Sequence, residues 1–226
     1  MPPAPARPTR RRAAPRRPGR PAQGDTDLRE HLLDAALAAF AAEGIKATSL
    51  KAIAARAGVT PALVHYYFGS KDALQAAVVE ERFMPVAASL RGLLGVPGQA
   101  PRALVAGFVG GVHALVERFP WLPVIWVREI LTEGGALRET MLSRIAPMVP
   151  QALAARFAQA QAGGDINRGL DPRLLVVSLV GLTLFPLAAE GLWRRMFPDA
   201  GLDHERLRQH TLALLDCGLE NRDARS

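Results

Sequence analysis

Apolar residues recur at helical spacing along nearly the whole chain, and the most informative pattern lies between Thr48 and Leu74. This stretch, TSLKAIAARAGVTPALVHYYFGSKDAL, predicts one helix from Ser49 to Ala57 and a second from Thr60 to about Tyr67. The apolar positions where the two helices would face each other are Leu50, Ile53, Ala54 and Ala57 in the first, and Val59, Val64, Tyr67 and Phe68 after the turn.

The residues at the turn support the same interpretation. Gly58 can adopt a positive φ because it has no Cβ to clash. Thr60 can cap the second helix, and Pro61 at its first position loses no N–H that the helix needs. Two crossed helices joined by such a turn predict a helix-turn-helix, whose second helix enters a DNA major groove.

A helix over residues 28–42 is predicted before this motif. Asp27, with Glu30 three residues later, predicts its start. Apolar side chains at helical spacing give it one buried face. They are Leu28, Leu32, Leu33, Ala36, Leu37 and Phe40.

A long helix is predicted after the motif. It begins at Ser70, whose side chain can cap it, and reaches Leu90 or beyond, with a kink or break at Pro85. We expect a small domain, 25–74, and a larger one, 75–220, to share this helix as a rigid connector. Residues 1–24 form a disordered arm and 221–226 a polar tail.

The rest of the chain is divided into helical segments by proline and glycine. No stretch alternates β-branched and polar residues, and no hairpin dipeptide occurs, so we predict an all-α fold. The predicted helices cover residues 102–119, 122–131, 136–162, 172–197 and 204–219.

Particular residues of the motif give the segment 28–74 a family resemblance. They are Thr48-Ser49, Ile53-Ala54, Ala57-Gly58-Val59, His65-Tyr66-Tyr67-Phe68 and Ser70-Lys71. With them, the segment resembles the TetR family of bacterial transcription regulators. The resemblance implies a three-helix DNA-binding domain followed by a larger helical ligand-binding and dimerisation domain. It further implies a homodimeric repressor, released from a palindromic operator by a small, largely apolar effector.

The DNA-binding residues follow from the motif and from the resemblance. The base-facing end of the second helix holds Thr60, Pro61, Ala62 and Leu63, three of which offer apolar contact to thymine methyls but no bidentate hydrogen bond. Lys51 or Thr60 could reach a base, and Ser49 offers a phosphate its N–H and hydroxyl. The resemblance implies phosphate contacts for His65, Tyr66 and Lys71, and core positions for Tyr67 and Phe68.

The charge of the chain is concentrated at its start. Residues 1–24 contain seven arginines and no acid, whereas the remainder holds 21 basic and 21 acidic side chains. Within this arm, Arg16-Arg17-Pro18-Gly19-Arg20-Pro21 resembles the core of an AT-hook, so Arg17 and Arg20 are candidates for the minor groove. The alternative is a non-specific cationic tail that speeds association.

Two sets of residues are candidates for the larger domain. An effector cavity between its central helices would be lined by aromatic, methionine and other apolar side chains, with four polar groups to orient the ligand. These candidates are Phe108, Val112, Trp121, Trp126, Met141, Ile145 and Phe185, with His113, Arg128, Glu129 and Arg144. The last two long helices would form the dimer interface through Leu175, Leu179, Leu182, Leu207 and Leu214, because apolar residues wrap more of the first helix than one core can use.

Several other functions have no sequence signature. The chain lacks a P-loop, a dinucleotide fingerprint and a nucleophile elbow, and its five histidines show no metal-ligand spacing, so we expect no enzyme, cofactor or metal site. The uncharged run 174–189 is shorter than a membrane span and contains Pro186. The single cysteine, Cys217, fits a reducing cytoplasm, and we expect its thiol to be buried. A DNA-binding protein of the cytoplasm would be nucleoid-associated.

Two alternatives to an effector-controlled regulator remain at this stage. One is an architectural DNA-binding protein that uses the arginine-rich arm with little sequence preference. The other is an enzyme or carrier built on the helical body, with the DNA-binding domain regulating its own gene. Footprinting and a search for bound metabolite would distinguish them.

Overall fold

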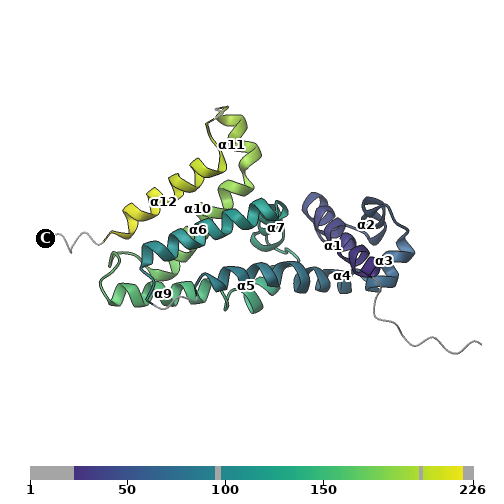
Figure 1. The fold of residues 1–226 in the computed structure, drawn as a ribbon, viewed down its shortest axis with the longest axis horizontal. Coiled ribbons are helices and arrows are strands. Elements are labelled where there is room, and N and C mark those ends of the chain that lie inside the picture. The colour runs from purple at the N-terminus through teal and green to yellow at the C-terminus, as the bar shows by residue number, and fades with distance from the viewer. Residues whose placement is uncertain (1–22, 95–97, 199–200, 221–226) are drawn as a thin grey trace, which may run out of the picture.

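The computed structural model describes residues 23–94, 98–198 and 201–220, and all the regular elements in this part of the chain are helices. Figure 1 shows a small head at one end of the long axis and a larger body at the other, joined by α4 and α5. The head contains α1 (Gln23–Glu43), α2 (Leu50–Ala57) and α3 (Pro61–Phe68). The predicted all-α fold is therefore confirmed.

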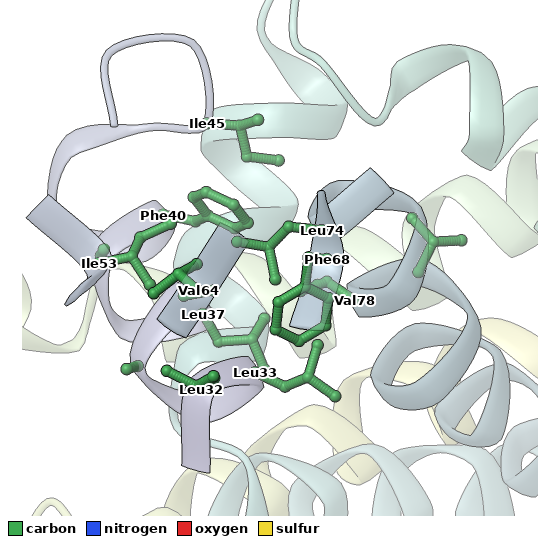
Figure 2. Packing of buried hydrophobic residues seen from close by; sticks show 14 of the residues in the cluster. Leu32, Leu33, Leu37, Phe40, Ile45, Ile53, Val64, Phe68, Leu74 and Val78 are labelled. Atoms are coloured by element: carbon green, nitrogen blue, oxygen red, sulfur yellow. The ribbon is translucent and has the colours of Figure 1, made fainter. Parts of the chain in front are cut away.

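The first helix starts earlier than predicted. It begins at Gln23, so Asp27 lies inside α1 and does not cap it. Leu32, Leu33, Leu37 and Phe40 point inward from α1 and are at most 1% exposed. They meet Ile53 and Val64 of the next two helices and Leu74 and Val78 of α4, forming the head core shown in Figure 2. Burial of this one apolar stripe positions α2 and α3 against α1.

The connector between head and body is helical without a break at Pro85, but it changes its hydrogen-bond register. It consists of α4 (Lys71–Val78), a π-helical turn, η1 (Val79–Phe83), and α5 (Met84–Gly92). The N–H of Met84 bonds back five residues to the carbonyl of Val79. Pro85 follows at once, and since proline has no N–H, the wider turn accommodates it without breaking the helix.

The body is formed by the remaining helices. Its long elements are α6 (Pro101–Arg118), α9 (Pro150–Ala162), α10 (Pro172–Ala188) and α12 (His204–Leu219). They enclose a second core in which Leu153, Phe157 and Leu179 are fully buried. Shorter elements join them: α7 (Trp121–Ile125), η2 (Trp126–Leu131), α8 (Arg138–Thr140), η3 (Met141–Ile145) and α11 (Glu190–Met196).

Two predicted helices of the body are broken. The segment 136–162 turns at residues 146–149, and Pro150 becomes the first residue of α9, because a proline ring clashes with a preceding helical turn. The segment 172–197 bends by 71° between α10 and α11. This bend falls at Ala189, three residues after Pro186, and the Trp193 indole N–H donates to the Pro186 carbonyl across it at 2.7 Å.

Candidate nucleic-acid interface

The turn between α2 and α3 has the predicted geometry. Ser49 caps α2, since its Oγ accepts the N–H of Ala52 at 3.1 Å. Gly58 has φ +68°, a left-handed conformation, and the N–H of Val59 bonds back to the Ala54 carbonyl at 3.0 Å. A side chain at position 58 would strain this backbone, so glycine fixes the corner and with it the angle at which α3 leaves α2.

Thr60 occupies the cap position of α3 without acting as a side-chain cap. Its backbone is extended, with φ −80° and ψ 149°, but its hydroxyl makes no capping hydrogen bond. The predicted capping role is therefore wrong for the side chain, because Pro61 already presets the first turn. Thr60 is exposed, so a base or phosphate can reach its hydroxyl.

The helix α3 separates its buried residues from its exposed ones. Val64 and Phe68 are buried and Tyr67 is half-buried, which confirms their core positions. On the other face, Thr60, Pro61, Ala62 and His65 are exposed, Leu63 is half-buried, and Tyr66 is 76% exposed. The rings of Tyr66 and Tyr67 meet edge to face with centroids 5.3 Å apart, so the half-buried tyrosine supports the exposed one.

Most cations of the head are held by protein groups. The ammonium of Lys71 donates to the Lys46 carbonyl at 2.8 Å, and the guanidinium of Arg29 lies over the Phe68 ring at 5.1 Å and pairs with Glu81. Lys51 is exposed on α2 and has no ion pair among the residues that the structure describes. Arg17 and Arg20 lie outside the described residues. The exposed face of α3, with Ser49 and Lys51, therefore forms the candidate interface.

Comparison with known proteins identifies this arrangement. Residues 32–78 match the model of the bacterial regulatory proteins of the tetR family. The transcriptional regulator TtgW of Pseudomonas putida is 32% identical over 116 residues, which are 51% of this chain and 84% of that protein. This chain belongs to the TetR family.

Two more relatives and two solved structures agree with membership of the TetR family. The regulator SrpR of Pseudomonas putida is 28% identical over 169 residues, covering 74% of this chain and 76% of that protein. The repressor NicS of Pseudomonas putida is 36% identical over 128 residues, covering 55% and 58%. The ketosteroid regulator KstR2 of Mycobacterium tuberculosis shares the fold with a TM-score of 0.69 at 20% identity, covering 86% and 95%. The regulator FadR of Bacillus subtilis, solved with stearoyl-CoA, has a TM-score of 0.64 at 20% identity, covering 84% and 99%.

The body of this TetR-family chain contains an apolar cavity of about 90 Å³. Five of the predicted effector-binding residues line it, namely Phe108, Val112, Trp126, Met141 and Ile145. Walls from the connector, among them Phe83, Ala87 and Leu90, complete it. The connector therefore touches both the cavity and the DNA-binding head.

The other six predicted effector-binding residues lie elsewhere. Trp121 packs against Phe83 with ring centroids 5.0 Å apart, and Arg144 pairs with Glu80 of the connector. His113 is buried beside His204 of α12, and Phe185 is 61% exposed on the outer side of α10. Arg128 binds the carbonyl of Ala41 in the last turn of α1, and Glu129 binds the N–H of Ile45 in the loop that follows. None of these six side chains lines the cavity, because each faces a neighbouring element or the solvent.

Two of the five predicted dimer residues are buried within the protomer. Leu175 and Leu179 are 6% and 0% exposed, so they belong to the protomer's own core. Leu182 and Leu207 are half-buried, and only Leu214 is exposed, at 49%. The outer side of α10 instead presents three exposed apolar side chains. These are Leu174, Val177 and Phe185, at 61–66% exposure.

Two further findings concern residues outside the interface. The thiol of Cys217 is exposed, contrary to the sequence prediction, because it follows Leu214 by three residues on the same side of α12. No single helix of the described chain is both long and apolar enough to cross a membrane, and only α10 and α11 together, bent by 71°, pass such a test.

Proposed function

We propose that the chain is a homodimeric repressor that leaves its operator when a small apolar effector fills the body cavity. The observation that carries this proposal is the connector of α4, η1 and α5. Its first residues pack in the head core behind α3, through Leu74 and Val78, and its later residues form walls of the cavity. One rigid element thus contacts both sites, so a ligand that prefers one connector position changes the other site.

The lining of the cavity defines the effector class. All fifteen lining side chains are apolar, from Phe83 on η1 to Leu184 on α10. Effector pockets usually measure ~300–1,000 Å³, so a cavity of about 90 Å³ must enlarge to accept a ligand. Such enlargement moves the walls, including the connector, and provides the differential affinity that release requires. The repressor sense is supported by the relative NicS, whose name describes a repressor.

The dimer would form through the outer sides of α10 and α12. Leu174, Val177, Gly181 and Phe185 follow one another at spacings of three and four residues, which places them on one stripe of α10. A Cβ at Gly181 would meet nothing within 4 Å, so this position leaves room for a partner helix. Burial of an exposed apolar stripe against its own copy is the usual basis of a twofold interface.

In such a dimer the two α3 helices would lie ~34–36 Å apart, in successive major grooves. Thr60, Pro61, Ala62 and Leu63 supply few hydrogen bonds to bases, so DNA shape would contribute to specificity. We include Arg17 and Arg20 as minor-groove contacts of the arm. Removal of residues 1–22 should then weaken binding and flatten its dependence on salt.

The experiment starts with selection of bound duplexes from a random pool, followed by footprinting of the selected site. A short protected palindrome is the expected result, whereas uniform coverage would favour an architectural protein. Light scattering then tests the dimer with Val177→Arg, which places a charge in the stripe. Leu142→Arg is the matched control, because Leu142 is 57% exposed on η3, away from α10. A monomer for the first variant and a dimer for the second are expected, and a dimer for both excludes this interface.

A further inference from the structure

A buried carboxylate joins the head of the protein to its body. Glu129, on η2, is 4% exposed. Its Oε1 accepts the N–H of Ile45 in the loop after α1 at 2.8 Å, and its Oε2 accepts the N–H of Ala136 in the body at 3.0 Å. A buried anion is tolerated only where hydrogen bonds replace its water. One carboxylate oxygen accepts a hydrogen bond from the head and the other from the body. Separation of the two domains would therefore remove one of these two hydrogen bonds from a buried charge.

Neighbouring groups reinforce the same contact. Arg128 donates to the carbonyl of Ala41 at 2.8 Å, and Lys46 donates to the carbonyl of Gly134 at 2.6 Å. Gly44 has φ +88°, and a Cβ there would lie 3.2 Å from Oε1 of Glu129. Glycine therefore allows the corner after α1 to close over the carboxylate. We name this set of contacts, Ala41–Lys46 against Arg128–Ala136, the clasp.

The clasp is continuous with the effector cavity. Trp126 and Ile130, which lie three residues before Glu129 and one residue after it, both line the cavity. The segment between them is a π-helical turn that ends with the N–H of Thr132 bonded to the Val127 carbonyl. A wall of the cavity and the carboxylate thus belong to the same turn, so displacement of Trp126 or Ile130 moves Glu129.

We propose that Glu129 is a positioning residue for DNA binding, which holds the head in one orientation and couples that orientation to the cavity. The coupling half of this proposal rests on the proposed function, and the positioning half does not. Coupling runs through the loop after α1 and acts alongside the connector. Glu129 itself touches neither the effector nor DNA.

The positioning half is tested by amide hydrogen exchange in the full chain without DNA. In Glu129→Gln, the amide N–H₂ can accept no bond, so one of the two backbone N–H groups loses its partner. Exchange at Ile45 or Ala136 should rise by about tenfold or more, as expected for the loss of a hydrogen bond to a charged group. Glu133→Gln, an exposed neighbour on the same loop, is the control and should change neither amide. Unchanged exchange at both amides in Glu129→Gln overturns the proposal.

A second variant keeps the test decisive if Glu129→Gln unfolds. Glu129→Asp retains the charge but shortens the side chain by one methylene, so it reaches only one of the two domains. Exchange should then rise at Ile45 or at Ala136, but not at both. Protection of both amides in this variant shows that the carboxylate does not bridge them.

The coupling half uses a substitution in place of an unidentified effector. Ala87→Leu, on the α5 wall, fills part of the cavity, and Val180→Leu on α10 does the same from another side. Each should change exchange at Ile45 in the wild-type background, and the change should disappear in combination with Glu129→Gln, as in a double-mutant cycle. An equal change in both backgrounds overturns the coupling. Because no DNA is used, failure to find an operator would refute the proposed function without affecting this result.

Discussion

Replacement of His113 by leucine should stabilise the protein. His113 lies on α6 and is 5% exposed, and its Nε2 has no hydrogen-bond partner among the described residues. A buried polar atom without a partner costs about 1–3 kcal/mol. Leucine has nearly the same volume as histidine and carries no polar atom. It cannot make the edge-to-face contact between the rings of His113 and His204, whose centroids are 6.4 Å apart. Aromatic pairs of this kind contribute ~0.5–1.5 kcal/mol. The difference predicts a net gain of about 1 kcal/mol at neutral pH.

The same substitution should remove a pH dependence. Burial lowers the pKa of His113, the nearby His204 and Arg208 lower it further, and Glu117 and Glu205 partly offset them. The folded pKa therefore lies below the unfolded value of ~6.5. Above the unfolded pKa, His113 is neutral in both the folded and the unfolded chain, so its titration does not lower the free energy of unfolding. As the pH falls from ~6.5 toward the folded pKa, only the unfolded chain gains a proton, so stability is lost across this window.

Urea unfolding at fixed protomer concentration, at pH 7.5, 6.5 and 5.5, measures both effects. At pH 7.5 the free energy of unfolding of His113→Leu should exceed that of the wild type, and Tm should rise by ~2–4 °C. The advantage should grow at pH 5.5, because the variant lacks the titrating group. His210→Leu, at an exposed position of α12, is the control and should change stability by less than ~0.5 kcal/mol. A variant less stable than the wild type, or one that keeps the wild-type pH slope, would refute this reasoning.

Three further predictions concern the interface and the two cores. Lys51→Ala should lower the slope of log affinity against log salt by ~0.9 for each protomer on DNA, measured by fluorescence anisotropy, and an unchanged slope would exclude a phosphate contact. Gly58→Ala should lower the free energy of unfolding, measured in urea, by about 1–2 kcal/mol, because Gly58 has φ +68°. Gly92→Ala, in the last turn of α5 with open space around it, is the control and should not lower this free energy. Equal effects of the two substitutions would contradict the left-handed turn. Leu153→Ala should lower the free energy of unfolding by ~2–5 kcal/mol, because the Leu153 side chain is fully buried. The exposed Leu142 is the control, and Leu142→Ala should lower the same free energy by less than ~0.5 kcal/mol. Similar losses would contradict the assignment of the body core.

The helix-turn-helix could be predicted from sequence because its determinants are local. Ser49, Gly58 and Pro61 each act within four residues of their own position, through a cap, a left-handed turn and a preset first turn. The start of α1 could not be fixed in this way. A capping pair at Asp27 and Glu30 permits a helix to begin there, but nothing prevents the backbone from being helical before it, and α1 extends to Gln23.

The orientation of α10 shows what a pattern cannot determine. Its residues are apolar nearly all round, so periodicity does not reveal which side faces the protomer's own core. The structure turns Leu175 and Leu179 inward and leaves Leu174 and Val177 outside, a rotation of one residue from the prediction. That choice depends on the shapes of α6, α9 and α12, three other helices that pack on α10.

Arg128 and Glu129 were predicted as effector ligands for a similar reason. Charged side chains within an apolar segment indicate a site, but the partner of each lies more than 80 residues away, at the end of α1 for Arg128 and in the loop after it for Glu129. Lys46 was missed entirely, since its contact with the Gly134 carbonyl has no signal in the sequence. The sequence therefore indicated a functional polar position at Glu129, whereas its burial and its contacts with both domains could not be predicted.

The contacts of the head's cations sharpen the expected source of DNA affinity. Residues 25–82 contain six basic and eight acidic side chains. Four of the six cations, Arg29, Lys46, Lys71 and Arg82, bind carboxylates or backbone carbonyls of the protein itself. Within the described residues this leaves Lys51 and Arg56, both exposed, as cations without such a contact.

Two cations per protomer release few counterions, so the head alone predicts weak binding that depends little on salt. The arm of each protomer adds seven arginines. We therefore expect the arms to set the strength and salt dependence of binding, and α3 to select among sites already held by charge. Removal of residues 1–22 should then reduce affinity for every duplex by a similar factor, whereas Thr60→Ala should reduce it mainly for the selected operator. Competition with random-sequence DNA separates the two effects, and equal specificity losses in both variants would contradict this division of roles.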